Sequence, residues 1–228
     1  MSAAFFRLQQ LISPSLPIGA FTYSQGMEWA VESGWISNAE SLHSWLDSIL
    51  SGTMITMELP LLLRLADCIE NSDAQGCYDW SVYLLSCRET SELRAEEQQR
   101  GQAFTALLDK LPEAAVWPEL SQEAWRSAME LTQLTGFALA CHKWNISRED
   151  MLRGYLWSWL ENMVIGAVKL IPLGQSDGQR VLFRFTDVLE QACRDALDVE
   201  DDDIGASSPA QAIASSLHET QYCRLFRS

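Results

Sequence analysis

The sequence predicts an all-α, single-domain helical bundle of about eight to ten helices, with a mobile acidic linker and a C-terminal tail. Apolar residues recur at helical spacing along most of the 228 residues, and strands do not alternate with helices. Hydrophobic residues make up 47% and charged residues 21%, a composition that suits a globular domain with a sizeable core. We expect a helical domain at residues 1–197, a linker at 198–209, and a short helix with a tail at 210–228.

The first distinctive stretch is LPIGAFTYSQGMEW at residues 16–29. Its proline and glycines predict a turn at Pro17–Gly19, followed by a helix from about Ser24. Ser37-Asn-Ala-Glu40 has the spacing of a capping box and predicts the start of the next helix. A further helix should begin near Thr53, and Pro60 should kink or restart it because proline lacks the backbone N–H.

Three more helices are expected at 78–87, from 90 to about 111, and at 121–142. The second of these is rich in Glu, Gln and Arg and has a thin apolar side. Helical spacing makes surface ion pairs the default expectation for its charged residues. Those residues are Glu92, Glu96 and Glu97 with Arg88, Arg94 and Arg100.

The clearest helix is predicted from about Ser147 to Ile171, where two adjacent rows of apolar residues at spacing four form a broad stripe. Such a stripe indicates core packing. Gly174–Gly178 predicts a turn. The segment 179–197 alternates like a strand at first, but helical spacing fits it over a longer range, so we expect a helix.

Acidic residues at 200–203, followed by Gly205 and Pro209, predict a mobile linker. A short helix is expected at 210–217. The chain then ends with HETQYCRLFRS, in which aromatic and leucine side chains accompany two arginines. This composition is typical of protein interfaces, because these side chains combine buried area with directional hydrogen bonds.

The formal net charge of −15 opposes binding to nucleic-acid backbones and to anionic membrane surfaces. No window approaches 18 uninterrupted apolar residues, so we expect no membrane span. The six cysteines are scattered and the N-terminus lacks the pattern of a secretion signal. We therefore expect reduced thiols and a cytoplasmic location.

No catalytic or metal-binding constellation is assembled in the sequence. Ser24 and Gly26 match half of the G-x-S-x-G nucleophile elbow, but the first glycine and the preceding strand are missing. The three histidines show no chelating spacing. His218 with Cys223 could still contribute to a metal site shared between chains. These observations favour an interaction protein over an enzyme.

Four stretches together resemble the sequence blocks of the urease accessory protein family UreF. In chain order they are LPIGAFTYSQGMEWAVESGWI, RETSELRAEEQQRGQAF, IPLGQSDGQR and HETQYCRLFRS. The resemblance spans about Leu8 to Ser228. The departures are Met27, where leucine is usual, and Cys223, where serine is usual, and neither changes the character of its block.

The resemblance implies an all-helical fold that forms homodimers and has a non-enzymatic role in assembling the nickel centre of urease. Family members bind UreD, also called UreH, and the nickel-carrying GTPase UreG, and this complex docks on apo-urease. The chain would bridge UreD and UreG and control GTP-dependent nickel delivery. The resemblance implies no cofactor in the isolated chain, because the complex handles the nickel.

The resemblance also implies roles for particular residues. The last block would become ordered against UreD and shape the surface for UreG, with parts of the first block beside it. These partner-binding residues are Phe21, Tyr23, Ser24, His218, Glu219, Tyr222, Arg224, Leu225, Phe226 and Arg227. The two middle blocks would be scaffolding for that surface. Their residues are Glu92, Arg94 and Gln98, and Gln175, Asp177, Gly178 and Gln179.

Three other hypotheses remain open at this point. A direct nickel metallochaperone is disfavoured by the few histidines. A helical hydrolase with Ser24 as nucleophile is disfavoured by the missing elbow. An arginine that directly stimulates the GTPase is possible in principle, and the sequence does not single one out.

Overall fold

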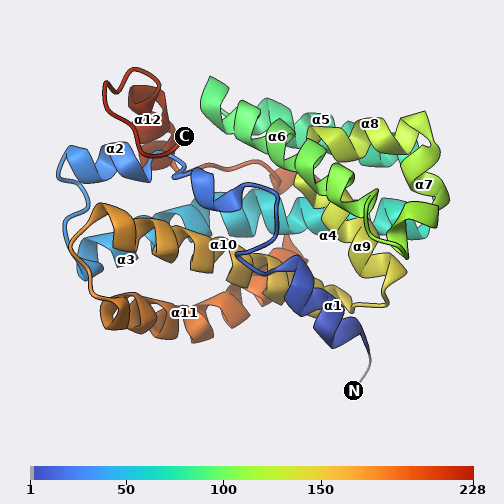
Figure 1. Cartoon of the computed structure of the whole chain (residues 1–228), viewed down its shortest axis with the longest axis horizontal. Helices are drawn as coiled ribbons and strands as arrows, with labels where there is room; N and C mark the ends of the chain where they lie inside the picture. The colour runs from blue at the N-terminus through green and yellow to red at the C-terminus, as the bar shows by residue number, and fades with distance from the viewer. Residues whose placement is uncertain (1–2) are drawn as a thin grey trace.

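The centre of the molecule is one long helical run built from α3 (Ala39–Ile49), the π-helical segment η2 (Leu50–Glu58) and α4 (Leu59–Glu70) (Figure 1). The computed structural model describes residues 3–228. By length and composition alone this run could cross a membrane, but 72% of its most apolar window is buried inside the fold. It is therefore the core helix around which the others pack.

Two groups of helices cover this core. At one end, α5 packs on α8, and α6 packs on both α8 and α9. Along one side, α10 and α11 lie next to each other, with α1 against α10 (Figure 1). The bounds are α1 Ala3–Leu11, α5 Ala74–Cys87, α6 Ser91–Leu108, α7 Pro118–Ser121, α8 Glu123–Leu131, α9 Gln133–Lys143, α10 Arg148–Leu170 and α11 Gln175–Asp195. Short 3₁₀ turns are η1 Ala20–Thr22, η3 Ala114–Val116, η4 Ala196–Asp198 and η5 Asp201–Asp203.

A third, smaller group consists of two short helices that are distant in sequence. The short helices α2 (Met27–Glu32) and α12 (Pro209–His218) pack against each other, and the C-terminus lies beside both (Figure 1). Gly26 makes this close packing possible. Its φ of 84° is left-handed, and a Cβ there would lie 2.6 Å from the main-chain nitrogen of Ser215.

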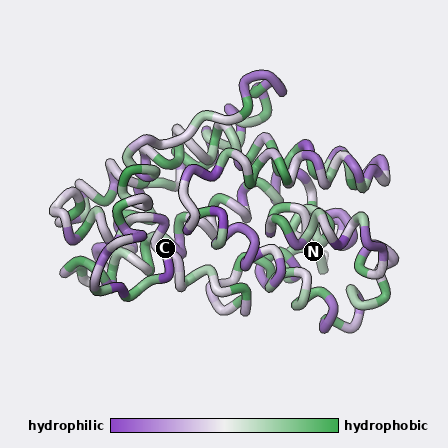
Figure 2. Tube along the Cα trace, turned by 90° about the horizontal axis from the view of Figure 1, so that it is seen from above, coloured by the Kyte–Doolittle hydropathy of each residue, from purple (hydrophilic) through white to green (hydrophobic). Residues whose placement is uncertain are grey.

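The all-α prediction is confirmed, since residues 3–228 contain helices and turns without a strand. Figure 2 shows apolar and polar stretches alternating along the helices, as expected when each helix buries one face. The helical assignment of 179–197 is confirmed by α11, and Ser147 caps α10 as expected by accepting a hydrogen bond from the Asp150 N–H at 3.1 Å. Pro60 follows the restart of α-helical structure at Leu59.

Several predicted boundaries were wrong for local reasons. The helix expected at 121–142 is broken at Thr132, which is extended and caps α9 through its hydroxyl. The capping box uses Asn38 with Ser41, not Ser37 with Glu40. The turn expected at Gly174–Gly178 is the start of α11, with Gly174 as its N-cap.

The segment expected to be a mobile linker is packed against the core, not detached from it. Arg64 donates to the Asp201 carboxylate at 2.6 Å and to the Val199 carbonyl at 2.7 Å. The Gly205 N–H donates to the Thr56 carbonyl at 3.1 Å. Pro60 has no N–H to offer that carbonyl at α-helical spacing, so Thr56 can accept from the linker.

Candidate functional site

The most distinctive contact in the fold joins a segment near the start of the sequence to the C-terminal residues. We call residues 219–228 the tail and residues 16–36 the first block. The Arg227 N–H donates to the Thr22 carbonyl at 2.8 Å, and the Ser24 N–H and hydroxyl donate to the Ser228 main-chain oxygen at 2.6 and 2.5 Å. The expectation that the first block lies beside the tail is therefore confirmed.

Glu28 of α2 is the central acceptor for the tail. Its carboxylate accepts the Leu225 N–H at 2.6 Å and the Phe226 N–H at 2.9 Å. The same carboxylate lies 3.2 Å from Nε2 of His218. Glu28 is buried, so these donors replace the water that an exposed carboxylate would bind. Nothing in the sequence distinguishes Glu28 from an exposed acid, because one acid on an amphipathic helix gives no signal that it faces inward.

His218 links the tail to α6. Its Nδ1 lies 2.7 Å from one oxygen of Glu92, whose other oxygen accepts from Nη1 of Arg224 at 2.7 Å. Both ring nitrogens of the fully buried His218 thus face carboxylates, while Cys223 is exposed. Within residues 3–228, no group of three or more His, Cys, Asp and Glu side chains is arranged to hold a metal ion.

Glu219 holds the start of the tail on the first turn of α6. Its carboxylate accepts the Ser91 N–H at 2.8 Å, the Ser91 hydroxyl at 2.7 Å and the Glu92 N–H at 3.3 Å. The hydrogen bond from Ser91 is the largest cause that lowers the pKa of Glu219 below its usual value. These bonds satisfy N–H groups that a helix start leaves without partners.

Three large hydrophobic side chains of these two segments are exposed. Tyr222 is fully exposed, Leu225 is 65% exposed and Phe21 is 50% exposed. Phe226 points inward and is buried. The Lys169 ammonium lies 5.8 Å from the ring centre of Phe21 and 6.0 Å from that of Phe226, so one cation contacts both blocks. We call Phe21, Tyr222 and Leu225 the apolar face.

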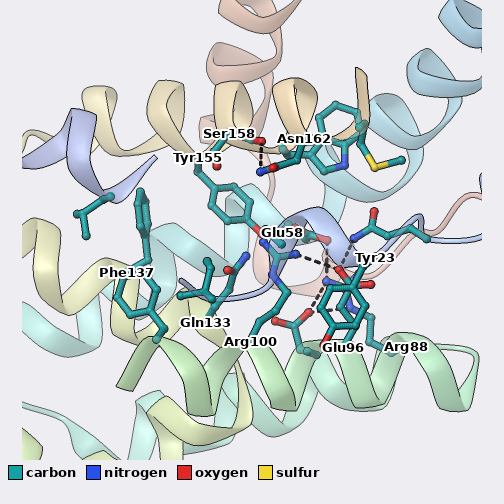
Figure 3. Close-up of a pocket in the computed structure, with 18 residues that line it drawn as sticks. Tyr23, Glu58, Arg88, Glu96, Arg100, Gln133, Phe137, Tyr155, Ser158 and Asn162 are labelled. Atoms are coloured by element: carbon teal, nitrogen blue, oxygen red, sulfur yellow. Dashed lines mark hydrogen bonds and ion pairs between the residues drawn. The ribbon is translucent and has the colours of Figure 1, made fainter. Parts of the chain in front are cut away.

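A buried cluster of charges lines a pocket that also includes Tyr23 and Gln25 of the first block (Figure 3). One guanidinium nitrogen of Arg88 lies 2.6 Å from both Glu58 and Glu97. The Tyr155 hydroxyl donates to Glu58 at 2.5 Å, and the Thr132 hydroxyl donates to Glu97 at 2.5 Å. Burial alone would lower the pKa of Arg88, but Glu58 and Glu97 outweigh it and raise that pKa.

Glu96 connects this cluster to the tail. Its carboxylate accepts from Gln25 at 2.9 Å, from Arg100 at 3.0 Å and from the Ser228 hydroxyl at 3.1 Å. Burial is the main cause that raises the pKa of Glu96. The expectation of surface ion pairs was therefore wrong for Glu96 and Glu97 of α6 and for Arg88 at the end of α5, which all lie inside the fold. Residue spacing could not reveal this, because helical pairs look alike in sequence whether exposed or buried.

The remaining predicted residues take varied positions. Tyr23 donates to Gln99 at 2.7 Å, and Arg227 reaches the same oxygen at 3.5 Å. Arg94 donates to the Arg88 carbonyl at 2.6 Å, and Gln98 is half-buried on α6.

The third block lies at the start of α11, against α10. Asp177 accepts the Gly174 N–H at 3.2 Å, and Gln175 and Gln179 are exposed. A Cβ on Gly178 would lie 3.0 Å from the Val168 side chain. This block therefore helps to pack two helices.

Comparison with known proteins finds relatives that match the chain over nearly its whole length. The sequence profile of the UreF family matches residues 36–186. A urease accessory protein UreF from Alcanivorax borkumensis is 65% identical over 227 residues, covering 100% of this chain and 99% of the relative. UreF proteins from Alkalilimnicola ehrlichii and Citrobacter koseri are 46% and 45% identical, each covering 97% of this chain, with 95% and 96% of those relatives covered.

The buried cluster predicts a large stability loss when its cation is removed. Arg88→Met should lower the free energy of unfolding by about 3–5 kcal/mol, because it leaves Glu58 and Glu97 buried without their counter-charge. Arg126→Met removes the exposed pairs with Asp109 and Glu130 and should cost less than about 1 kcal/mol. Urea unfolding of both variants measures the difference. Equal losses would contradict this account of the cluster.

Proposed function

The chain belongs to the UreF family of urease accessory proteins, and we propose that it acts as a non-enzymatic bridge between UreD and the GTPase UreG. In this role it regulates GTP-dependent nickel delivery to apo-urease in the cytoplasm. The isolated chain needs no cofactor for this work, since the complex carries the nickel. The observation that carries the proposal is the apolar face, an exposed surface built on the contact between the first block and the tail.

The apolar face has the composition expected of a docking site. Tyr222 and Leu225 project apolar area into solvent, while the backbone from Leu225 to Arg227 is fixed by Glu28 and Thr22. Fixing the backbone lowers the conformational entropy that a partner must remove on binding. Arg224, held by Glu92, places a guanidinium at the edge of this face. We propose that UreD binds here and that UreG binds next to it.

The competing hypotheses fit the geometry less well. A hydrolase would need Ser24 as an accessible nucleophile, but Ser24 is fully buried and its hydroxyl donates to the Ser228 main chain. A direct metallochaperone through His218 would need a free ring nitrogen, and both nitrogens face carboxylates. An arginine that reaches into UreG would have to be exposed, and regulation of UreG without direct catalysis needs no such residue.

A second surface favours a homodimer. Phe5 and Phe6 of α1 are 54% and 68% exposed, and their rings meet edge to face at 5.4 Å. Beside them runs a groove lined by Leu8 and Ile12 of α1 and by Trp157 of α10. Exposed rings next to an apolar groove on the same surface suit a two-fold contact, in which each copy offers rings to the groove of the other. We propose that this face joins two copies of the chain.

The apolar face predicts a loss of partner binding from two side chains. The double variant Tyr222→Ser, Leu225→Ser should weaken binding of UreD by about tenfold or more, because the two truncations remove exposed interface area. Val116→Ser removes a side chain that is 79% exposed on η3 and serves as the matched control. Calorimetric titration with purified UreD measures both. An unchanged affinity of the double variant for UreD would contradict the docking proposal.

The α1 face predicts a change in oligomeric state. The wild-type chain should sediment as a dimer, and Phe5→Ser, Phe6→Ser should shift it toward the monomer. Phe183→Ser, which removes a ring that is 81% exposed on α11, should leave the dimer intact. Analytical ultracentrifugation at several concentrations distinguishes these cases. A monomeric wild type, or a double variant that remains fully dimeric, would contradict the proposed interface.

A further inference from the structure

Among the contacts that hold the tail, one buried carboxylate on α2 accepts from its backbone twice. Glu28 accepts two consecutive backbone N–H groups, those of Leu225 and Phe226, one on each carboxylate oxygen at 2.6 and 2.9 Å. Since the two N–H groups belong to neighbouring residues, they fix where the tail sits along α2. In this register Leu225 is exposed and Phe226 is buried.

The groups around Glu28 come from four segments. Glu28 lies on α2, His218 at the end of α12, Glu92 on α6 and Arg224 in the tail. The two ring nitrogens of His218 each face one carboxylate, Nε2 at 3.2 Å from Glu28 and Nδ1 at 2.7 Å from Glu92, and Arg224 donates to the other oxygen of Glu92 at 2.7 Å. These contacts supply polar partners for both carboxylates.

We propose that Glu28 is the positioning residue that sets the register of the tail and thereby presents Tyr222 and Leu225 outward. His218 and Glu92 support Glu28 by anchoring the stretch of chain that leads into Leu225 and Phe226. Glu28 is buried beneath the tail, so it acts on partner binding through the tail and not through contact with the partner. The link to partner binding rests on the proposed function, whereas the register of the tail does not.

Glu28→Gln is the direct test, because it keeps the shape of the side chain but replaces one acceptor oxygen with an N–H₂ group. That group faces a backbone N–H, so one tail bond is lost and a repulsive contact replaces it. We expect the Arg227 amide, which bonds to Thr22 and not to Glu28, to exchange with solvent about tenfold faster or more. Hydrogen exchange is measured on the full chain, free and bound to UreD.

Two control variants distinguish a change in the register of the tail from a general loss of charge or of folding. Glu32→Gln removes a charge one turn further along α2, where the carboxylate accepts from the side-chain amide of Gln221 and from no backbone N–H of Leu225 or Phe226, and should leave Arg227 exchange unchanged. Leu225→Pro deletes one of the two donors from the tail side and should accelerate exchange as Glu28→Gln does, while Leu225→Ala should not. Exchange of the α10 amides reports whether the core of each variant is intact.

The outcomes distinguish this inference from the proposed function. Faster tail exchange together with weaker UreD binding supports both. Faster tail exchange with unchanged UreD binding keeps the positioning role and overturns the docking role of the tail. Unchanged Arg227 exchange in both Glu28→Gln and Leu225→Pro, in the free and the bound chain, overturns the positioning role whatever UreD does.

Discussion

Buried carboxylates are the constraint on which this structure depends. Glu28, Glu58, Glu96 and Glu97 are all removed from water, and a buried carboxylate is costly unless donors surround it. The donors come from segments that are distant in sequence, including Arg88, Tyr155 of α10 and the backbone of the tail. Satisfying the acids therefore ties the first block, α6 and the chain end into one surface. The same acids that stabilise the interior fix the geometry of that surface.

This arrangement explains which parts of the molecule the sequence could predict. Helical periodicity identified the core helices, and the cap at Ser147 could be read from residue type alone. The break in the helix at Thr132 could not be predicted, because it depends on the Thr132 hydroxyl, which donates to Glu97 of another helix. The packing of the linker could not be predicted for a similar reason. Composition reports the polarity of a segment, but it does not show that the Thr56 carbonyl lacks its α-helical donor at Pro60.

The candidate site also contains some residues that the sequence could predict and others that it could not. Exposed Tyr222 and Leu225 could be predicted because aromatic and apolar residues in a polar tail indicate an interface. The role of Glu28 could not be predicted, because it depends on contact with a tail that is far from Glu28 in the sequence. Ser24 lies where the resemblance places it, but its side chain faces inward and bonds to Ser228. Its contribution is to hold the tail, and any contact with a partner falls to its exposed neighbours.

The central claim is that the first block and the tail together form the surface that UreD covers. Hydroxyl-radical footprinting of the full chain, alone and in complex with UreD, tests it most directly. The account predicts that Phe21, Tyr222 and Leu225 lose reactivity in the complex while the exposed ring of Phe183 does not. Equal reactivity of the apolar face in the free and bound states, with protection elsewhere, would contradict it.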